Sequence, residues 1–335
     1  MRQPRVSVFA VHRALRVALA MALLGGSAWS HAATDPKASK YFEDGLVRYE
    51  KKDLDGAIIQ LKNALQIDPT MLPVQVLLGK ALLQNGEALA SEMALLEALR
   101  LGVNRAEIVL LLAQTYLAQG KHKLIFEQQQ LLLPGLPPTV LQRRLLLRAS
   151  ASSDLGDVRG ALKAIDDARA IDPKFPGVWL AEVPVRIRTR KFTEATAAAE
   201  RGLALAPDAA EAWYQKGSIL HVMGQLEGAL AAYDRALASD TGHIETRISR
   251  TGIYIDLGRA DEASKDLNEL LNFAPHEPRA AYLRALLAER NKDFTAANAA
   301  LKDVINLIDP VPGLHTVPAA IADAQWPVAL RVGTT

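Results

Sequence analysis

Apolar positions follow the spacing of α-helices over most of the chain. They recur three or four residues apart, which places them on one face of a helix. The pattern is clearest in 57–65 and 229–237, where an alanine is followed by apolar residues one, four, seven and eight positions later. Polar residues fill the positions between them. The pattern predicts amphipathic helices that pack along one face.

The helical pattern itself repeats every 34 residues. A small residue marks the same point of successive periods at Ala57, Ser91, Ala161, Ala195, Ala229, Ala263 and Ala297. Glycine recurs before that point at Gly86, Gly120, Gly156, Gly224 and Gly258, and proline after it at Pro69, Pro173, Pro207 and Pro275. Small residues permit close helix packing, glycine adopts turn conformations and proline ends a helix. The marks therefore predict a tandem array of helix pairs.

These marks resemble the tetratricopeptide repeat, a helix–turn–helix unit of 34 residues. The repeat that fits best carries Trp213, Gly217, Gly224, Ala229, Tyr233 and Ala236. The resemblance covers about residues 38–310. It implies an all-α fold, a tetratricopeptide-type α-solenoid that winds as a right-handed superhelix of about eight helix-turn-helix repeats. We expect repeats 1–3 in 33–132, a proline-rich turn at 133–140 and repeats 4–8 in 141–310.

Some positions depart from the repeat. Pro184 falls inside the first helix of the fifth repeat and predicts a bend, because an interior proline removes a hydrogen bond. Gln129 stands where an apolar residue belongs, so the third repeat has a weak second half. The turn at 133–140 coincides with a two-residue insertion; we favour a long turn over a hinge. Residues 311–335 predict an irregular tail that lacks a polar capping helix.

Residues 1–32 have the layout of a secretory signal peptide. Arg2, Arg5, Arg13 and Arg16 precede an apolar stretch, and Ser30-His31-Ala32 offers small residues for cleavage after Ala32. The alternative is an uncleaved membrane anchor. The stretch 17–29 has 13 residues, short of the ~20 that a spanning helix needs. We therefore expect an exported protein, periplasmic or in the cell envelope, with no transmembrane span after cleavage.

Composition and charge exclude some classes of function. The 335 residues include no cysteine, so disulfides, thiolate nucleophiles and cysteine-based metal sites are excluded. The net charge of +2 comes from the leader, because without residues 1–32 the chain has 35 basic and 37 acidic residues. A near-neutral chain gives no electrostatic case for binding nucleic acid.

The sequence shows no arrangement typical of catalysis. It has no glycine-rich phosphate loop and no Gly-x-Ser-x-Gly turn. The seven histidines are scattered, and Pro278 directly after His276-Glu277 rules out a helical zinc motif there. We predict that the protein is not an enzyme and has no catalytic residues, no metal and no cofactor. An acid–base pair supplied by two different repeats remains open.

The resemblance implies a binding groove on the concave side, which the first helix of each repeat lines. Positions that face the groove in this family correspond here to Tyr49, Lys80, Gln114, Arg143, Arg188, Tyr214, His221, Asp256, Tyr282 and Arg290, and also to Val76, Leu180 and Ile248. We expect Tyr214, His221 and Tyr282 to be exposed, whereas leucines at these positions could equally be core. Co-chaperones of this family bind a carboxylate with an asparagine at a fixed repeat position. None of the repeats here has asparagine at that position, so we expect that this clamp is absent.

A narrower resemblance rests on 41–45, 56–65 and 279–287. These segments look like the tetratricopeptide lipoproteins of the exosortase (PEP-CTERM) system of Gram-negative bacteria. The resemblance implies an envelope protein linked to exopolysaccharide production and protein sorting. The chain departs from that group because it has no cysteine to lipidate and fewer repeats.

The sequence thus favours a scaffold that binds a protein or peptide segment in its groove, with the envelope polysaccharide machinery as a possible setting. The alternative is an envelope protein that binds exopolysaccharide directly, with groove aromatics as stacking platforms for sugars.

Overall fold

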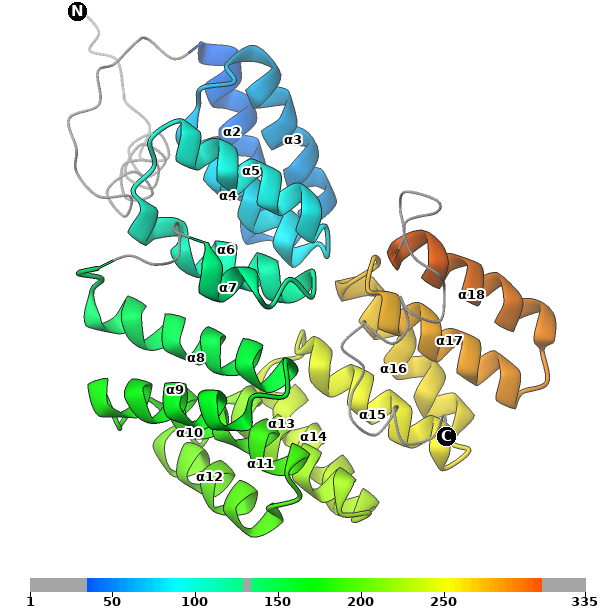
Figure 1. Cartoon of the computed structure of the whole chain (residues 1–335). Coiled ribbons are helices and arrows are strands. Elements are labelled where there is room, and N and C mark those ends of the chain that lie inside the picture. The colour runs from blue at the N-terminus through cyan, green and yellow to red at the C-terminus, as the bar shows by residue number, and fades with distance from the viewer. Residues whose placement is uncertain (1–34, 129–133, 309–335) are drawn as a thin grey trace, which may run out of the picture. The chain divides into compact units, whose positions relative to one another are not determined.

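A computed structural model describes residues 35–128 and 134–308, and every regular element in these ranges is an α-helix (Figure 1). The chain divides into two compact units, Met1–Thr115 and Tyr116–Thr335. The expected signal peptide and C-terminal tail lie outside the described residues, as does Gln129. The expected all-α fold is confirmed in the part of the chain that the structure describes.

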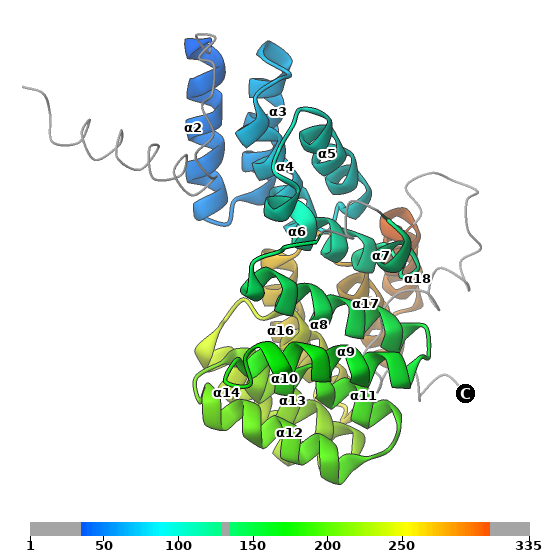
Figure 2. The ribbon, with the colours of Figure 1, turned by 60° about the vertical axis from the view of Figure 1, so that its left-hand side comes forward.

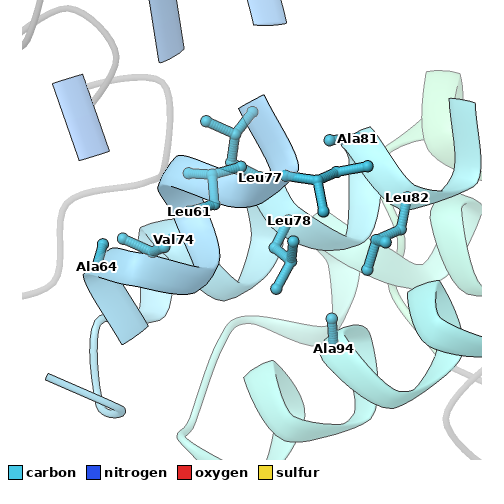
Figure 3. Packing of buried hydrophobic residues seen from close by; sticks show 9 residues of the cluster. Leu61, Ala64, Val74, Leu77, Leu78, Ala81, Leu82 and Ala94 are labelled. Carbon is cyan, nitrogen blue, oxygen red and sulfur yellow. The ribbon is translucent and has the colours of Figure 1, made fainter. Parts of the chain in front are cut away.

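The first compact unit consists of consecutive helix pairs. Its helices are α2 (Pro36–Glu50), α3 (Leu54–Ile67), α4 (Leu72–Gln84), α5 (Ala88–Arg100) and most of α6 (Arg105–Ala118). The helices of each pair pack on each other, and α3 also packs on α4. Leu61 of α3, Leu78 and Leu82 of α4 and Ala94 of α5 belong to one buried apolar cluster (Figure 3). Truncation of a leucine in such a core typically costs about 2–5 kcal/mol.

The second compact unit continues the same construction. Its helices are α7 (Leu124–Glu127), α8 (Pro138–Asp154), α9 (Val158–Ile171), α10 (Pro176–Leu180), α11 (Glu182–Arg188), α12 (Phe192–Leu205), α13 (Ala210–Val222), α14 (Leu226–Ser239), α15 (Ile244–Asp256), α16 (Ala260–Phe273), α17 (Pro278–Arg290) and α18 (Phe294–Ile308). From α8 onward, each first helix packs on its second helix, and the second helix on the next pair. Figure 2 shows α8, α9 and α12 following one another in layers.

The turn inside each pair explains the recurring glycines. All five that the sequence singles out have positive φ, between 67° and 84°, a region that residues with a Cβ avoid. Three pairs place a long basic residue at the equivalent point, and it adopts the same conformation: Lys52, Arg190 and Lys292.

Aspartates start several of the second helices. The Oδ1 atoms of Asp53, Asp157 and Asp293 accept hydrogen bonds of 2.8–3.0 Å from the backbone N–H three residues later. Such caps satisfy N–H groups that have no partner inside the helix. The three aspartates occupy the same point of the repeat, so the sequence sets the start of these helices locally.

Where a bend at Pro184 is expected, the structure has an interruption of the helix. The first helix of its pair splits into α10 and α11 at Ala181. The proline has no N–H to donate to the carbonyl of Leu180, and its ring crowds that carbonyl. The helix therefore breaks one turn before the proline.

Candidate protein-binding surface

Within each compact unit, first helices of successive pairs contact one another, as α2 does with α4, α13 with α15 and α15 with α17. We call their outward side the first-helix face: α2, α4 and α6 in the first compact unit, and α8, α11, α13, α15 and α17 in the second. Side chains about one repeat apart connect neighbouring helices of this face, for example Arg188 of α11, whose Nη1 donates to the Ser153 carbonyl of α8 at 2.5 Å. The sequence period therefore has a direct counterpart in the contacts between pairs.

Three expected site residues belong to the first compact unit. Tyr49 is half-buried, and its Oη accepts a hydrogen bond of 2.8 Å from Gln84 Nε2. Burial raises the pKa of the Tyr49 hydroxyl. Lys80 is half-buried on α4 close to Glu107, whose pKa is raised by burial and lowered less strongly by the Lys80 charge. Gln114 is exposed on α6.

Basic residues lie on the first-helix face where the second compact unit begins. Arg143 of α8 is exposed, and its guanidinium lies 5.9 Å from the centre of the Phe175 ring. Arg188 Nη2 lies 3.2 Å from Asp154 Oδ1. Cation–π contacts and ion pairs at exposed sites contribute about 1 kcal/mol or less. Arg143 therefore remains available to a partner with acidic groups, whereas both Nη atoms of Arg188 are engaged by α8.

The expectation that Tyr214 is exposed is wrong. The side chain is half-buried, stacks on Tyr233 with ring centres 6.0 Å apart and contacts His243 at 5.4 Å. Burial is the largest cause of the raised pKa of Tyr214, and the nearby Glu245 charge adds to it. Tyr214 therefore packs between its own pair and the next, with only part of the ring presented outward.

The expectation that His221 is exposed is also wrong, because its ring is half-buried against the edge of Tyr233 at 6.5 Å. Burial lowers the pKa of His221, and the carboxylate of Asp256 opposes this shift. Asp256 itself is exposed and pairs with Arg290, with 3.2 Å between Oδ1 and Nη2. His221, Asp256 and Arg290 thus follow one another along α13, α15 and α17.

Tyr282 of α17 is half-buried rather than exposed, and it lines a pocket with Leu286 and Glu289. Three further residues that the sequence assigns to the groove are buried instead: Val76, Leu180 and Ile248. Their helices turn this position toward neighbouring helices, so the residues belong to the core.

The repeat pattern gave no indication of the charge pairs that connect successive first helices. Arg279 of α17 donates from Nη1 and Nη2 to the two carboxylate oxygens of Glu245 on α15, each at 2.7 Å. Arg279 also donates to Glu277 at 2.8 Å. Burial opposes the charge of Arg279, but the two glutamates outweigh it and raise its pKa. A comparison of residues one period apart for opposite charge would have found this pair.

A second charged cluster ties α15 to α16 and α14. Arg250 Nη2 lies 2.5 Å from Asp266 Oδ1, and its Nη1 lies 2.5 Å from Asp234 Oδ1. Asp266 is almost fully buried, so removal of its partner would leave an uncompensated charge in the interior. This cluster ties α15, the helix that carries Asp256, to its neighbours α14 and α16.

Neither a metal site nor a membrane span emerges from the described helices. Within 35–128 and 134–308, no group of three or more histidine or carboxylate side chains could hold a metal ion. In the same ranges, every helix is too short or too polar to cross a bilayer.

Family models of the tetratricopeptide repeat match residues 180–244 and 220–287. No curated protein matches the sequence. Among solved structures, yeast Tom70 is 15% identical over 99% of this chain and 76% of its own, with a TM-score of 0.57. The Cut9–Hcn1 assembly of the APC/C is 15% identical over 88% of this chain and 57% of its own, with a TM-score of 0.50. At this identity the structures establish the fold alone. The described part of the chain therefore has an α-solenoid architecture like theirs, and its residues 180–287 match the tetratricopeptide repeat.

Proposed function

We propose that the protein is a non-catalytic scaffold that binds a segment of a partner protein on its first-helix face. The observation that carries the proposal is the continuity of this face in the second compact unit. Contacts one repeat apart, such as Asp256–Arg290 and Glu245–Arg279, connect α15 and α17 side by side. A continuous face of this kind can contact an extended or helical segment along several repeats.

The chemistry of the face favours a partner segment that offers both apolar and charged groups. Tyr214 and Tyr282 are half-buried residues of this face, and Arg143 and Arg290 are exposed on it. Tyrosine and arginine are frequent anchors at protein interfaces because they bury large areas at low entropic cost. The exposed glutamates Glu211 and Glu289 would pair with basic groups of the partner.

We propose the periplasm or the cell envelope as the setting, with a link to exopolysaccharide production and exosortase-type sorting. The layout of residues 1–32 and the narrower family resemblance support this setting. The test is N-terminal sequencing of the protein from fractionated cells. A mature chain that starts at Ala33 in the periplasmic fraction supports the proposal, whereas an uncleaved chain in the cytoplasm contradicts it.

The binding proposal is tested by comparing two charge-reversed variants. Arg143→Glu with Arg290→Glu reverses charges on the first-helix face; Lys163→Glu with Lys265→Glu reverses the same number on the second helices α9 and α16. Each immobilised protein is incubated with envelope extract, and bound proteins are quantified by mass spectrometry. We expect a partner that the wild type and the α9/α16 variant retain equally and that the face variant loses at least tenfold. Equal retention by both variants contradicts the proposal.

Direct binding of exopolysaccharide is the second candidate. Sugar stacking requires open aromatic faces, and Tyr214 instead has Tyr233 and His243 against its ring. The structure thus gives this candidate weaker support than protein binding. Affinity electrophoresis in gels that contain the polysaccharide separates the two, since only a polysaccharide-binding protein is retarded.

A further inference from the structure

The last described helix pair carries an apolar side that no described residue covers. In the preceding pair, Leu267 of α16 is 3% exposed because α17 packs over it. Leu301 of α18 lies one repeat later and is 37% exposed, and Ile305 and Phe294 are 38% and 63% exposed. Leu301 therefore occupies the place at which Leu267 of α16 receives α17.

The uncovered side contains an open pocket of about 290 Å³. It is lined by Tyr282, Ala285, Leu286 and Glu289 of α17 and by Phe294, Ala297, Asn298 and Leu301 of α18. Glu289 is the only charged residue in this lining, so an occupant must be mainly apolar. Exposed apolar patches of this kind usually mark a binding surface.

The chain itself supplies a segment with matching composition. Residues 310–335 follow α18 directly; 13 of these 26 residues are apolar and only Asp323 and Arg331 are charged. Segments that remain in water are typically poor in apolar residues and rich in charge. The composition therefore favours burial of this segment against an apolar surface.

The connection is long enough for the segment to return along α18. The 15 residues of α18 span about 22 Å at the helical rise. Residues 309–317 could span up to about 30 Å when extended. A segment that begins at Pro318 can therefore reach Phe294 at the far end of the helix, and its covalent attachment gives a high effective concentration.

We propose that residues 318–332 dock into the α17–α18 pocket and place Ile321 and Trp326 against Leu301 and Phe294. The segment serves as an apolar cover for the exposed side chains of α18. Because Tyr282 lines the pocket and also belongs to the first-helix face, the docked segment covers this end of that face. The proposal does not depend on the identity of any partner.

The absence of cysteine from the sequence permits a direct test in the full chain. Asn298→Cys lines the pocket, whereas Ala299→Cys next to it is exposed on the other side of α18. Each is combined with Ala324→Cys, and the rate of disulfide formation under mild oxidation is measured by mass spectrometry. We expect an intramolecular disulfide that forms at least tenfold faster with Cys at 298 than with Cys at 299.

A further substitution separates docking from chance encounters. Trp326→Asp, added to the 298/324 pair, is expected to slow the disulfide to the rate of the 299/324 control. Equal rates for the two pairs, or no effect of Trp326→Asp, would overturn the proposal. Disulfides mainly between two molecules would also overturn it and would identify a second copy of the chain as the occupant.

Discussion

At the scale of single residues, the turn inside each helix pair offers a clear test of backbone strain. Lys52 has φ of 63° where the equivalent turns use glycine. A side chain in this region costs about 1–2 kcal/mol, partly offset by the entropy that glycine loses on folding. We expect Lys52→Gly to stabilise the protein by about 0.5–1 kcal/mol in urea unfolding. Lys52→Ala keeps the Cβ and should change little; equal stabilisation by both variants would contradict the strain argument.

The half-buried His221 is expected to make the free energy of unfolding depend on pH. Burial lowers its pKa in the folded protein below the ordinary value of 6.5. As the pH falls through 6.5, the unfolded chain binds a proton at this residue before the folded protein does, so the free energy of unfolding decreases. The decrease is complete once the pH is below the folded-state pKa. We expect His221→Gln to show a smaller loss of stability than the wild type between pH 7 and pH 5, as measured by urea unfolding.

Tyr214 and His221 show what the sequence could not predict about the site. The repeat pattern correctly places Tyr214 and His221 on a first helix, and both contribute to the first-helix face. Their exposure depends on Tyr233 of α14 and, for Tyr214, on His243 in the turn before α15. A residue's place in the repeat does not reveal which side chains of its own pair and of the next pair reach it.

At the scale of helices, several pairs pack closely at a point where a glycine of the first helix meets a large side chain of the second. Gly45 faces Leu61, Gly79 faces Leu95 and Gly217 faces Tyr233. A Cβ added at Gly217 would lie 2.4 Å from Cε1 of Tyr233, closer than real contacts allow. Because Tyr233 is fully buried, its ring has no space into which it can move.

We therefore expect Gly217→Ala to destabilise the protein by about 1–3 kcal/mol, the usual cost of overpacking. Gly228→Ala is the matched control, since it also lies inside a helix but its added Cβ has no neighbour closer than 3.5 Å. That variant should be neutral or more stable by up to about 1 kcal/mol, because alanine favours the helix. Chemical unfolding of both variants distinguishes packing from helix propensity; equal effects would contradict the packing argument.

Helix boundaries were largely predictable because local chemistry sets them. Asp53 and Asp157 cap their helices within three residues, and Pro184 acts on the carbonyl one turn before it. The buried cluster of Arg250 and Asp266 was not predictable, because its members come from two helices and each looks like an ordinary solvated charge in the sequence.

At the scale of the whole molecule, successive helix pairs stack on one another within each compact unit. The period of 34 residues in the sequence reappears as contacts between residues 34 apart, including Arg279 with Glu245 and Arg290 with Asp256. The period was readable from small residues and glycines. The contacts that convert it into a continuous face depend on charged residues, and the repeat pattern fixes the place of these residues but not their charge.

A double-mutant cycle between Glu245 and Arg279 tests this register most directly. Glu245→Gln, Arg279→Gln and the double variant are compared with the wild type by urea unfolding, and the coupling free energy is obtained from the four values. Stacking of α15 on α17 predicts a favourable coupling of about 1 kcal/mol, because Glu245 is partly exposed and Arg279 is mostly buried. Additive effects of the two substitutions would show that these residues do not meet, and would contradict the stacked array and the binding face built on it.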